Sequence, residues 1–262
     1  MNKADGTAAG DHAWKRLYLT GGVAALAAGL VFRRNLGPEA YLLTGQALPD
    51  SAMGWFTLLQ DNRLPGLVML NLFDVVDYAL VGLMFLALCV VLWRYNRSYT
   101  LIAAALGLAG ITICITSNSA VSMLSLSDQY AAATTDAQRS MLLAAGEAIL
   151  AIDNPGAYFQ GTGAYMGFLL VATAGLALSL VMLQSGVFGR VTAFTGILAS
   201  VSDLAFCVLV AFVPWTGLIL VPLAGLLLMI WHILTGLKLI RLWRDAPEAR
   251  RIAMSNADTG AI

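Results

Sequence analysis

Apolar residues fall in six long blocks along the chain, and polar segments separate one block from the next. The blocks cover residues 17–32, 67–93, 99–121, 162–183, 191–213 and 218–240. A helix needs about 20 apolar residues to cross about 30 Å of hydrocarbon. The blocks lack the short alternating strands of a membrane barrel. We therefore predict an all-α protein, a six-span transmembrane helical bundle.

The first block is the shortest, and basic residues bracket it on both sides. Leu17–Phe32 extends about 24 Å as a helix, with Lys15 and Arg16 before it and Arg33 and Arg34 after it. Long basic side chains can snorkel to the interface and make up the missing length. The block starts like a signal peptide, but no convincing small-residue cleavage site follows it. We interpret it as an uncleaved first span.

Two polar segments on one side of the predicted bundle are long. Residues 36–64 contain several breakers, and we expect this loop to fold over the membrane surface. The segment between spans three and four predicts an extra amphipathic helix, because Thr135 precedes Gln138 by the capping-box spacing. Its expected apolar face comprises Met141, Ala145, Ala148 and Ile152. Its expected polar face comprises Asp136, Arg139, Ser140 and Glu147. We expect this helix to lie on the membrane surface, or to pack on the bundle as a structural lid.

Composition agrees with a membrane protein and argues against nucleic-acid binding. Of 262 residues, 59% are hydrophobic and only 11% are charged, against about 25% charged in typical soluble domains. Fifteen basic residues balance fifteen acidic ones, so the chain offers no strongly basic patch. The predicted organisation is a flexible cytoplasmic N-terminus over 1–16, the membrane domain over 17–243 and a flexible cytoplasmic C-terminus over 244–262.

Basic residues also predict an orientation. With six spans, most of them fall on one side, and that side is expected to be cytoplasmic. The residues on this side are Lys3, Lys15, Arg16, Arg94, Arg97, Arg190, Lys238, Arg241, Arg244, Arg250 and Arg251. Arg33, Arg34, Arg63 and Arg139 fall on the other side, in loops that also carry acidic residues. We predict that both termini are cytoplasmic.

The chain offers little for catalysis. One histidine, His232, lies in a span, and we find no metal-binding motif, phosphate-binding glycine loop or nucleophile elbow. The three cysteines lie inside apolar blocks and are expected to be buried, without a disulfide framework. We predict no metal and no cofactor. Gly163 with Gly167, and Ala103 with Gly107, have the spacing of close helix–helix contacts, which we expect to be intramolecular.

A polar cluster stands near one end of the second span. Asn71, Asp74, Asp77 and Tyr78 share one side of a helix, and Asn118 in the third span lies at about the same height. Two interpretations stay open. The carboxylates are interfacial and reach headgroup water, or they face the bundle interior around a water-filled vestibule.

Asp203 and His232 lie close to mid-membrane in the fifth and sixth spans. Counting helical rise from the predicted span ends puts their heights within about 5 Å of each other. An isolated charged carboxylate there needs a partner or a proton. We predict that the two side chains lie within hydrogen-bond reach. The pair then either locks two helices together or responds to protons or cations.

Two segments resemble a known family. They are "YAAATTDAQRSMLLAAGEA", residues 130–148, and "GVFGRVTAFTGILAS", residues 186–200. Together with the six-span hydropathy, they resemble a family of uncharacterised bacterial multi-pass integral membrane proteins, a domain of unknown function of the DUF-forty-three-eighty-six type. The resemblance implies a helical fold and a location in the bacterial cytoplasmic membrane, and it implies no catalytic residues.

The functional expectation follows from these points. The leading hypothesis is a membrane protein that senses, binds or contacts a protein partner through its outer face. The alternative is a small-solute or proton-coupled transporter or channel that uses the intramembrane Asp, Asn and His side chains. A membrane-embedded enzyme comes third. The expected partners are the lipid bilayer and a protein on the outer face, and the sequence leaves the oligomeric state open.

Overall fold

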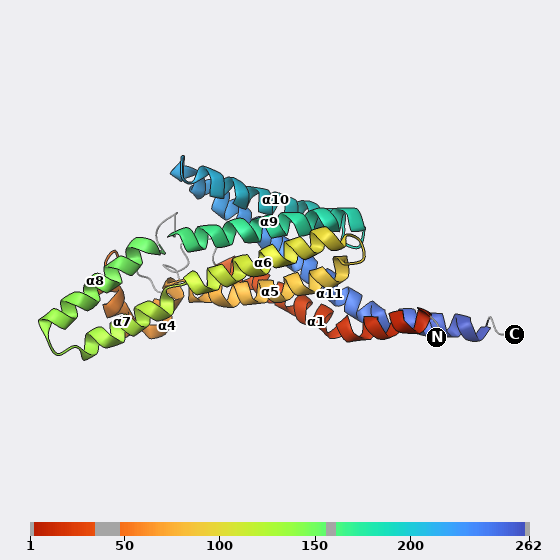
Figure 1. Ribbon diagram of the computed structural model, residues 1–262, viewed down its shortest axis with the longest axis horizontal. Coiled ribbons are helices and arrows are strands. Elements are labelled where there is room, and N and C mark those ends of the chain that lie inside the picture. Colours follow the sequence, from red (N-terminus) through yellow and green to blue (C-terminus); the bar gives the residue numbers. More distant parts are fainter. Residues whose placement is uncertain (1–2, 35–47, 156–160, 260–262) are drawn as a thin grey trace.

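The computed structural model describes residues 3–34, 48–155 and 161–259, and the regular structure in these ranges is entirely helical. Six long helices run side by side and form one elongated bundle (Figure 1). They are α1 (Lys3–Arg34), α5 (Leu72–Leu92), α6 (Arg97–Ser117), α9 (Gly161–Ser185), α10 (Arg190–Leu209) and α11 (Gly217–Thr259). Both chain termini lie at one end of the molecule, which we call the terminal end.

The bundle closes on itself as a ring. Going around it, α1 packs on α5, α5 on α6, α6 on α9, α9 on α10, α10 on α11, and α11 returns to α1. A short 3-10 turn, η1 (Pro214–Thr216), connects α10 to α11 at the end opposite the termini. Phe85 of α5 and Trp231 of α11 meet inside the ring with ring centroids 6.4 Å apart, and both are about 1% exposed. The ring therefore encloses a packed aromatic layer.

Five segments of the described chain are long and apolar enough to cross a membrane. They cover Leu72–Leu92, Arg97–Ala132, Gly161–Ser185, Arg190–Leu209 and Pro214–Asp245. Helices therefore occupy the places of the predicted second to sixth spans. Helix α1 is not among the five, and its uninterrupted apolar run, Leu17–Phe32, is the shortest of the predicted blocks. The multi-pass character is supported by five helices, and the sixth crossing stays a prediction.

Four shorter helices form a second region at the end opposite the termini. They are α3 (Ala52–Asp61), α4 (Arg63–Met69), α7 (Ala120–Ala132) and α8 (Asp136–Ile152). We call this region the cap and that end of the molecule the cap end. A separate apolar cluster holds it together, centred on Trp55, Phe56, Leu59 and Met123, each no more than 1% exposed. The cap thus has its own small core.

The structure corrects the prediction of a loop over residues 36–64. Residues 35–47 lie outside the described part, but α3 and the start of α4 occupy most of the rest. Ser51 caps α3 by accepting the Gly54 N–H, and Trp55 and Phe56 of α3 are buried. A run of buried positions at Ala52, Trp55, Phe56 and Leu59 has helical spacing. The turn residues around the helix obscured this pattern in the sequence.

A helix is present as α8 where one was predicted after span three, and its orientation relative to a membrane stays a prediction. The Thr135–Gln138 capping box is confirmed. Helix α7 extends beyond α6, and α8 returns beside it, so the two project from the end of the bundle (Figure 1). The face that packs is Leu142, Gly146 and Leu150. Met141 and Ile152 of the predicted apolar face are 65% and 69% exposed, so that face does not pack on the bundle as a lid. Its contact with a membrane surface stays a prediction.

Both terminal segments that were predicted to be flexible lie largely within helices. Helix α1 begins at Lys3, and α11 continues to Thr259. The flexibility of these segments stays a prediction. The three cysteines are free, with Cys114 and Cys207 buried and Cys89 partly buried. Gly163, Gly167 and Gly107 make close intramolecular contacts between helices, as their spacing predicted.

Candidate functional site: the junction between bundle and cap

Two long helical paths break at the same place, where the bundle meets the cap. The first break separates α4 from α5 at Asn71, which has a left-handed backbone with φ 60°. Asparagine tolerates this conformation better than most residues. The second break separates α6 from α7 at Asn118, which has an extended backbone. Each break leaves helical N–H and C=O groups that need other partners.

The Asn118 side chain supplies those partners to both breaks. Its Nδ2 donates to the Asn71 carbonyl at 3.0 Å and, more weakly, to the Leu70 carbonyl at 3.5 Å. Its Oδ1 accepts the Ala120 N–H at 3.1 Å. One amide therefore caps the end of α4 and the start of α7 and joins them. This gives Asn118, a predicted site residue, a structural role as well.

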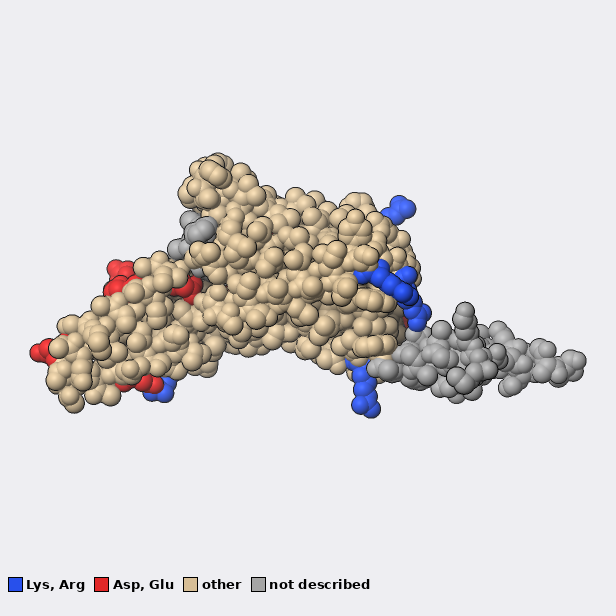
Figure 2. Space-filling model, viewed as in Figure 1, with Lys and Arg blue, Asp and Glu red and all other residues tan. Residues whose placement is uncertain are grey.

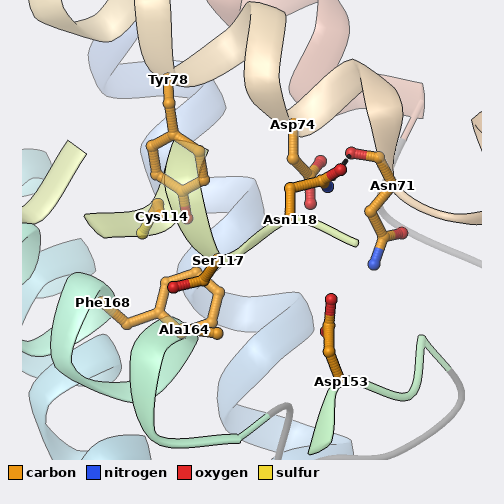
Figure 3. Close-up of a pocket in the computed structure, with 9 residues that line it drawn as sticks. All are labelled: Asn71, Asp74, Tyr78, Cys114, Ser117, Asn118, Asp153, Ala164 and Phe168. Atoms are coloured by element: carbon orange, nitrogen blue, oxygen red, sulfur yellow. Dashed lines mark hydrogen bonds between the residues drawn. The ribbon is translucent and has the colours of Figure 1, made fainter. Parts of the chain in front are cut away.

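A small cavity opens beside this amide, and we call it the junction cavity (Figure 3). Its volume is about 30 Å³, which suffices for one or two water molecules. The cavity is therefore too small for an organic solute in this state. Its lining comprises Asn71, Asp74, Tyr78, Cys114, Ser117, Asn118, Asp153, Ala164 and Phe168.

Two carboxylates face the junction cavity from opposite sides. Asp74 comes from the first turn of α5, and Asp153 comes from the end of α8, where it is the C-cap residue (Figure 3). Burial raises the pKa of Asp153 above its ordinary value, and the neighbouring Ser119 hydroxyl and N–H oppose this shift. The cavity thus brings a bundle carboxylate and a cap carboxylate to one small polar space.

The wall toward the membrane domain is less polar. The Tyr78 hydroxyl lies beside the Cys114 thiol, and the Tyr78 ring packs against Phe168 with centroids 6.4 Å apart. Gly163 and Gly167 let α9 approach α6 closely below the cavity, because a Cβ at either position would collide with Ser117 or Cys114. The cavity therefore has a packed floor.

The structure separates the predicted site residues into three places. Asn71, Asp74, Tyr78 and Asn118 line the junction cavity. Asp77 does not line it: its side chain is 4% exposed, and Oδ1 has no hydrogen-bond partner among the described residues. Asp203 and His232 lie elsewhere in the bundle. The predicted site residues did not include Asp153, Ser117 or Cys114. Asp153 comes from the end of α8, and Ser117 and Cys114 come from the end of α6, next to Asn118.

The predicted contact between Asp203 and His232 is absent. Gly196 of α10 faces Trp231 of α11, since a Cβ at Gly196 would lie 2.5 Å from the Trp231 Nε1. These helices are antiparallel, so Asp203 lies seven residues toward the cap end and His232 one residue toward the terminal end. The separation along the bundle is about 12 Å. His232 faces α1 instead, near Gly29.

The arrangement suits binding of water or ions better than bond-making chemistry. Within the described residues, no three His, Cys, Asp or Glu side chains gather in a way that could hold a metal ion. The cavity lining contains Ser117 and Cys114 as potential nucleophiles, and it contains no histidine to act as their base. Its chemistry is that of two carboxylates, amides and hydroxyls around a small wet space.

Comparison of this chain with known proteins identifies no relative. No family model, no curated protein and no solved structure matches this chain. Function must therefore be inferred from the geometry of this molecule.

Proposed function

We propose that the chain is a six-span protein of a bacterial cytoplasmic membrane, with α1 as the sixth crossing. Helix α1 closes the ring between α5 and α11 and runs alongside both. Gly21 and Gly22 let α1 approach these two neighbours, because a Cβ at either would meet α5 or α11 within 2.8 Å. The apolar run Leu17–Phe32 spans about 24 Å, and basic side chains at its ends can extend its reach. Membership of the resembling family of multi-pass proteins is part of this proposal.

The distribution of charge supports an orientation with the cap outside the cell. Lys and Arg side chains gather at the terminal end of the bundle, whereas acidic side chains are spread over the cap (Figure 2). Short loops rich in Lys and Arg stay in the cytoplasm. The test uses single cysteines in a chain whose native cysteines are replaced: Ser140→Cys in the cap and Ser98→Cys in the first turn of α6. A membrane-impermeant maleimide should label intact cells only through Ser140→Cys, and labelling of Ser98→Cys alone would reverse the orientation.

We infer that the cap is a sensing or partner-binding head that communicates with the membrane domain. The observation that carries this inference is the Asn118 junction. Two spans, α5 and α6, continue into cap helices α4 and α7, and one side chain joins both breaks. A force on the cap therefore reaches two spans at once. An independent lid with a single attachment would lack this coupling.

The exposed face of α8 supplies a surface for a partner. Met141 and Ile152 are strongly exposed, and Ala144 and Ala148 between them are exposed as well. The α7–α8 pair projects away from the bundle, so most of this strip lies beyond the membrane domain. Exposed apolar strips on a soluble surface mark contact sites.

Site-specific photo-crosslinking in the native membrane tests this function. A photoreactive residue at Met141 should give one discrete protein adduct. Ala144→Glu should abolish the adduct, whereas Ser122→Glu on α7 should leave it intact. The same residue at Leu218, an exposed position of α11, should give only lipid adducts. If Met141 gives no adduct and the purified protein conducts protons or solutes in liposomes, the cap function is wrong.

The second candidate is a proton-coupled transporter. It is favoured by one observation, the two carboxyls Asp77 and Asp203 inside the helical bundle. The junction cavity argues against passage of an organic solute, because it holds only one or two waters. A liposome flux assay with Asp203→Asn as the comparison separates the two candidates. Proton-driven flux that the substitution abolishes would favour transport.

A further inference from the structure

Two carboxyl groups inside the bundle have no counter-charge among the side chains that the structure describes. Asp77 is 4% exposed, and its Oδ1 has no hydrogen-bond partner. Asp203 is partly buried, and no hydrogen bond or ion pair joins it to the described residues. Both belong to helices that are long and apolar enough to cross a membrane. Most acidic side chains inside membranes interact with another charged or polar group. Two acids without such a partner among the described residues therefore require an explanation.

Both carboxyls lie toward the cap end of their helices. Phe85 of α5 and Trp231 of α11 form the aromatic layer, and Gly196 of α10 faces the Trp231 ring. Asp77 lies eight residues from Phe85 toward the cap end, or about 12 Å. Asp203 lies seven residues from Gly196 in the same direction, or about 10.5 Å. Each carboxyl therefore lies toward the cap end from the contact that its helix makes with the aromatic layer.

Asp77 belongs to the inward face of its helix. It shares a face of α5 with Val81, Met84 and Leu88, at i+4, i+7 and i+11. These three residues belong to the central core cluster and are at most 4% exposed. A lipid-facing position would share its face with exposed residues instead.

Asp203 likewise belongs to the packed face of α10. It shares that face with Gly196, Ser200 and Cys207, which are buried. Gly196 contacts Trp231 and Ser179, so this face points toward α11 and α9. The helices α5 and α10 lie on opposite sides of the ring. The two carboxyls therefore face the bundle interior from opposite sides.

The titratable groups around the carboxyls carry no positive charge. Around Asp77 they are Asp74 and Tyr78 on α5 and Cys114 on α6. Around Asp203 the described one is Cys207 on α10, and Tyr165 on α9 packs against the cluster that contains Cys207.

The basic residues of the described chain lie elsewhere. On α11, His232 is about 12 Å from Asp203 along the bundle. On α1, the described side chains of residues 14–31 include Lys15 and Arg16, which lie at the terminal end. Arg63 and Arg139 lie on the cap, and the other described basic side chains, Arg94, Arg97, Arg190, Lys238, Arg241 and Arg244, lie toward the terminal end of the bundle. The side chains of Arg33 and Arg34 lie outside the described ones.

We propose that Asp77 and Asp203 are the proton-binding sites of the membrane domain, and that each carries a proton at neutral pH. A carboxylate that is removed from water without a cation costs several kcal/mol, and binding a proton removes that cost. The neighbouring Asp74 adds to this effect at Asp77, because two like charges on successive turns repel. Loss of either proton leaves a negative charge inside the ring, so deprotonation requires water or a cation to enter. This inference does not depend on the role of the cap.

Infrared spectroscopy of the purified full-length protein in lipid tests the proposal. A protonated carboxylic acid has a C=O stretch well above the amide bands, and exposed carboxylates do not contribute to it at neutral pH. Wild-type protein should show this band at pH 7, and the band should shift in D2O. Asp77→Asn and Asp203→Asn should each remove about half of it, and the double variant should remove all of it. Asp128→Asn, which changes a surface ion pair with Arg63, should leave it unchanged.

Thermal stability gives a second readout, because asparagine imitates a neutral carboxyl. Asp77→Asn and Asp203→Asn should keep Tm within a few degrees of wild type. If the carboxyls are charged and paired with cations instead, each Asn variant should lose substantial stability. Absence of the C=O band at pH 7, or a band that survives the double substitution, would overturn the proposal.

Discussion

The cap and the bundle are both helical, but different interactions hold them together. The cap uses polar bonds between its helices. The Gln60 amide donates to Ser127, the Ser127 hydroxyl donates to the Phe56 carbonyl, and Arg63 pairs with Asp128 at 2.8 Å. Its apolar core contains large side chains such as Trp55. These are the interactions of a small soluble domain, in which burial of apolar area is the main driving force.

The bundle relies on small residues and close helix contacts. A Cβ on Gly21 would lie 2.3 Å from Ala87, one on Gly107 would lie 2.4 Å from Phe85, and one on Gly167 would lie 2.2 Å from Cys114. Lipid is as apolar as leucine, so association of spans depends on fit between backbones and side chains. From this comparison we expect that added side-chain volume destabilises the bundle, and that loss of polar side chains destabilises the cap.

The largest effect is expected from volume added at the centre of the bundle. The Cβ of Gly196→Ala would lie 2.2 Å from the Ser179 hydroxyl and 2.5 Å from the Trp231 ring. Overpacking of this kind costs about 1–3 kcal/mol, and we expect the upper end because the indole is fully buried. Thermal unfolding followed by size-exclusion chromatography measures it. Gly189→Ala is the matched control, since a Cβ there meets no atom within 4 Å. Equal stability of the two variants would contradict the close-contact account.

The next effect is expected at the junction that joins the two regions. Asn118→Ala removes the donor to the Asn71 carbonyl and the acceptor for the Ala120 N–H. Each lost bond is worth about 0.5–1.5 kcal/mol, so the variant should lose about 2 kcal/mol. Hydrogen exchange should rise in both α4 and α7. Asn118→Asp retains the acceptor and should protect α7 only. Increased exchange confined to one break would show that the amide does not link them.

A smaller effect is expected from a polar contact inside the cap. The Glu147 Oε1 accepts the Ala52 N–H at 2.7 Å, at the start of α3. A carboxylate at a helix N-terminus stabilises by about 0.3–1 kcal/mol. Glu147→Ala should lower cap stability by that amount, and Glu147→Gln should lose less because it can still accept the bond. Hydrogen exchange of the α3 backbone amides as denaturant is added measures both. If Glu147→Ala is as stable as wild type, this hydrogen bond does not contribute to the stability of the cap.

The smallest effect concerns pH at the junction cavity. Burial raises the pKa of Asp153 in the folded protein above its ordinary value of 3.8. The folded state therefore binds this proton more tightly than the unfolded state. The resulting stabilisation is complete below pH 3.8 and is lost as the pH rises through the raised pKa. Asp153→Asn should flatten that part of the stability–pH curve. If the stability of Asp153→Asn depends on pH as steeply as that of wild type, another group is responsible for the pH dependence.

The sequence predicted the bundle more accurately than the cap. The fourth span was expected at 162–183, and the structure has Gly161–Ser185. The third span was expected at 99–121, but α6 ends at Ser117 and a new helix begins at Ala120. Hydropathy does not register this break, because apolar residues continue across it. The break is visible only through the bonds that Asn118 makes with another part of the chain.

The residues of the candidate site also divide into those that the sequence could place and those that it could not. The sequence placed Asn71, Asp74 and Asn118 at similar heights, because helical rise converts residue number into depth. It could not place Asp153, which reaches the cavity only because α7 and α8 fold back. The pairing of Asp203 with His232 failed for a related reason. Depth counted from assumed span ends carries the error of those ends, whereas the contact of Gly196 with Trp231 sets the true register.

By itself, the sequence determined that long apolar helices form, roughly where they lie along the chain, and which of them carry acids. These properties depend on the composition and spacing of residues within one segment. They follow from whether each segment is more stable in lipid or in water. Tertiary structure alone decided which acids share a cavity, which face of α8 is buried and how the helices register. Those outcomes depend on contacts between segments far apart in the chain. The fit of glycine against a neighbouring helix, or of one amide against two helix ends, selects among alternatives that hydropathy treats as equal.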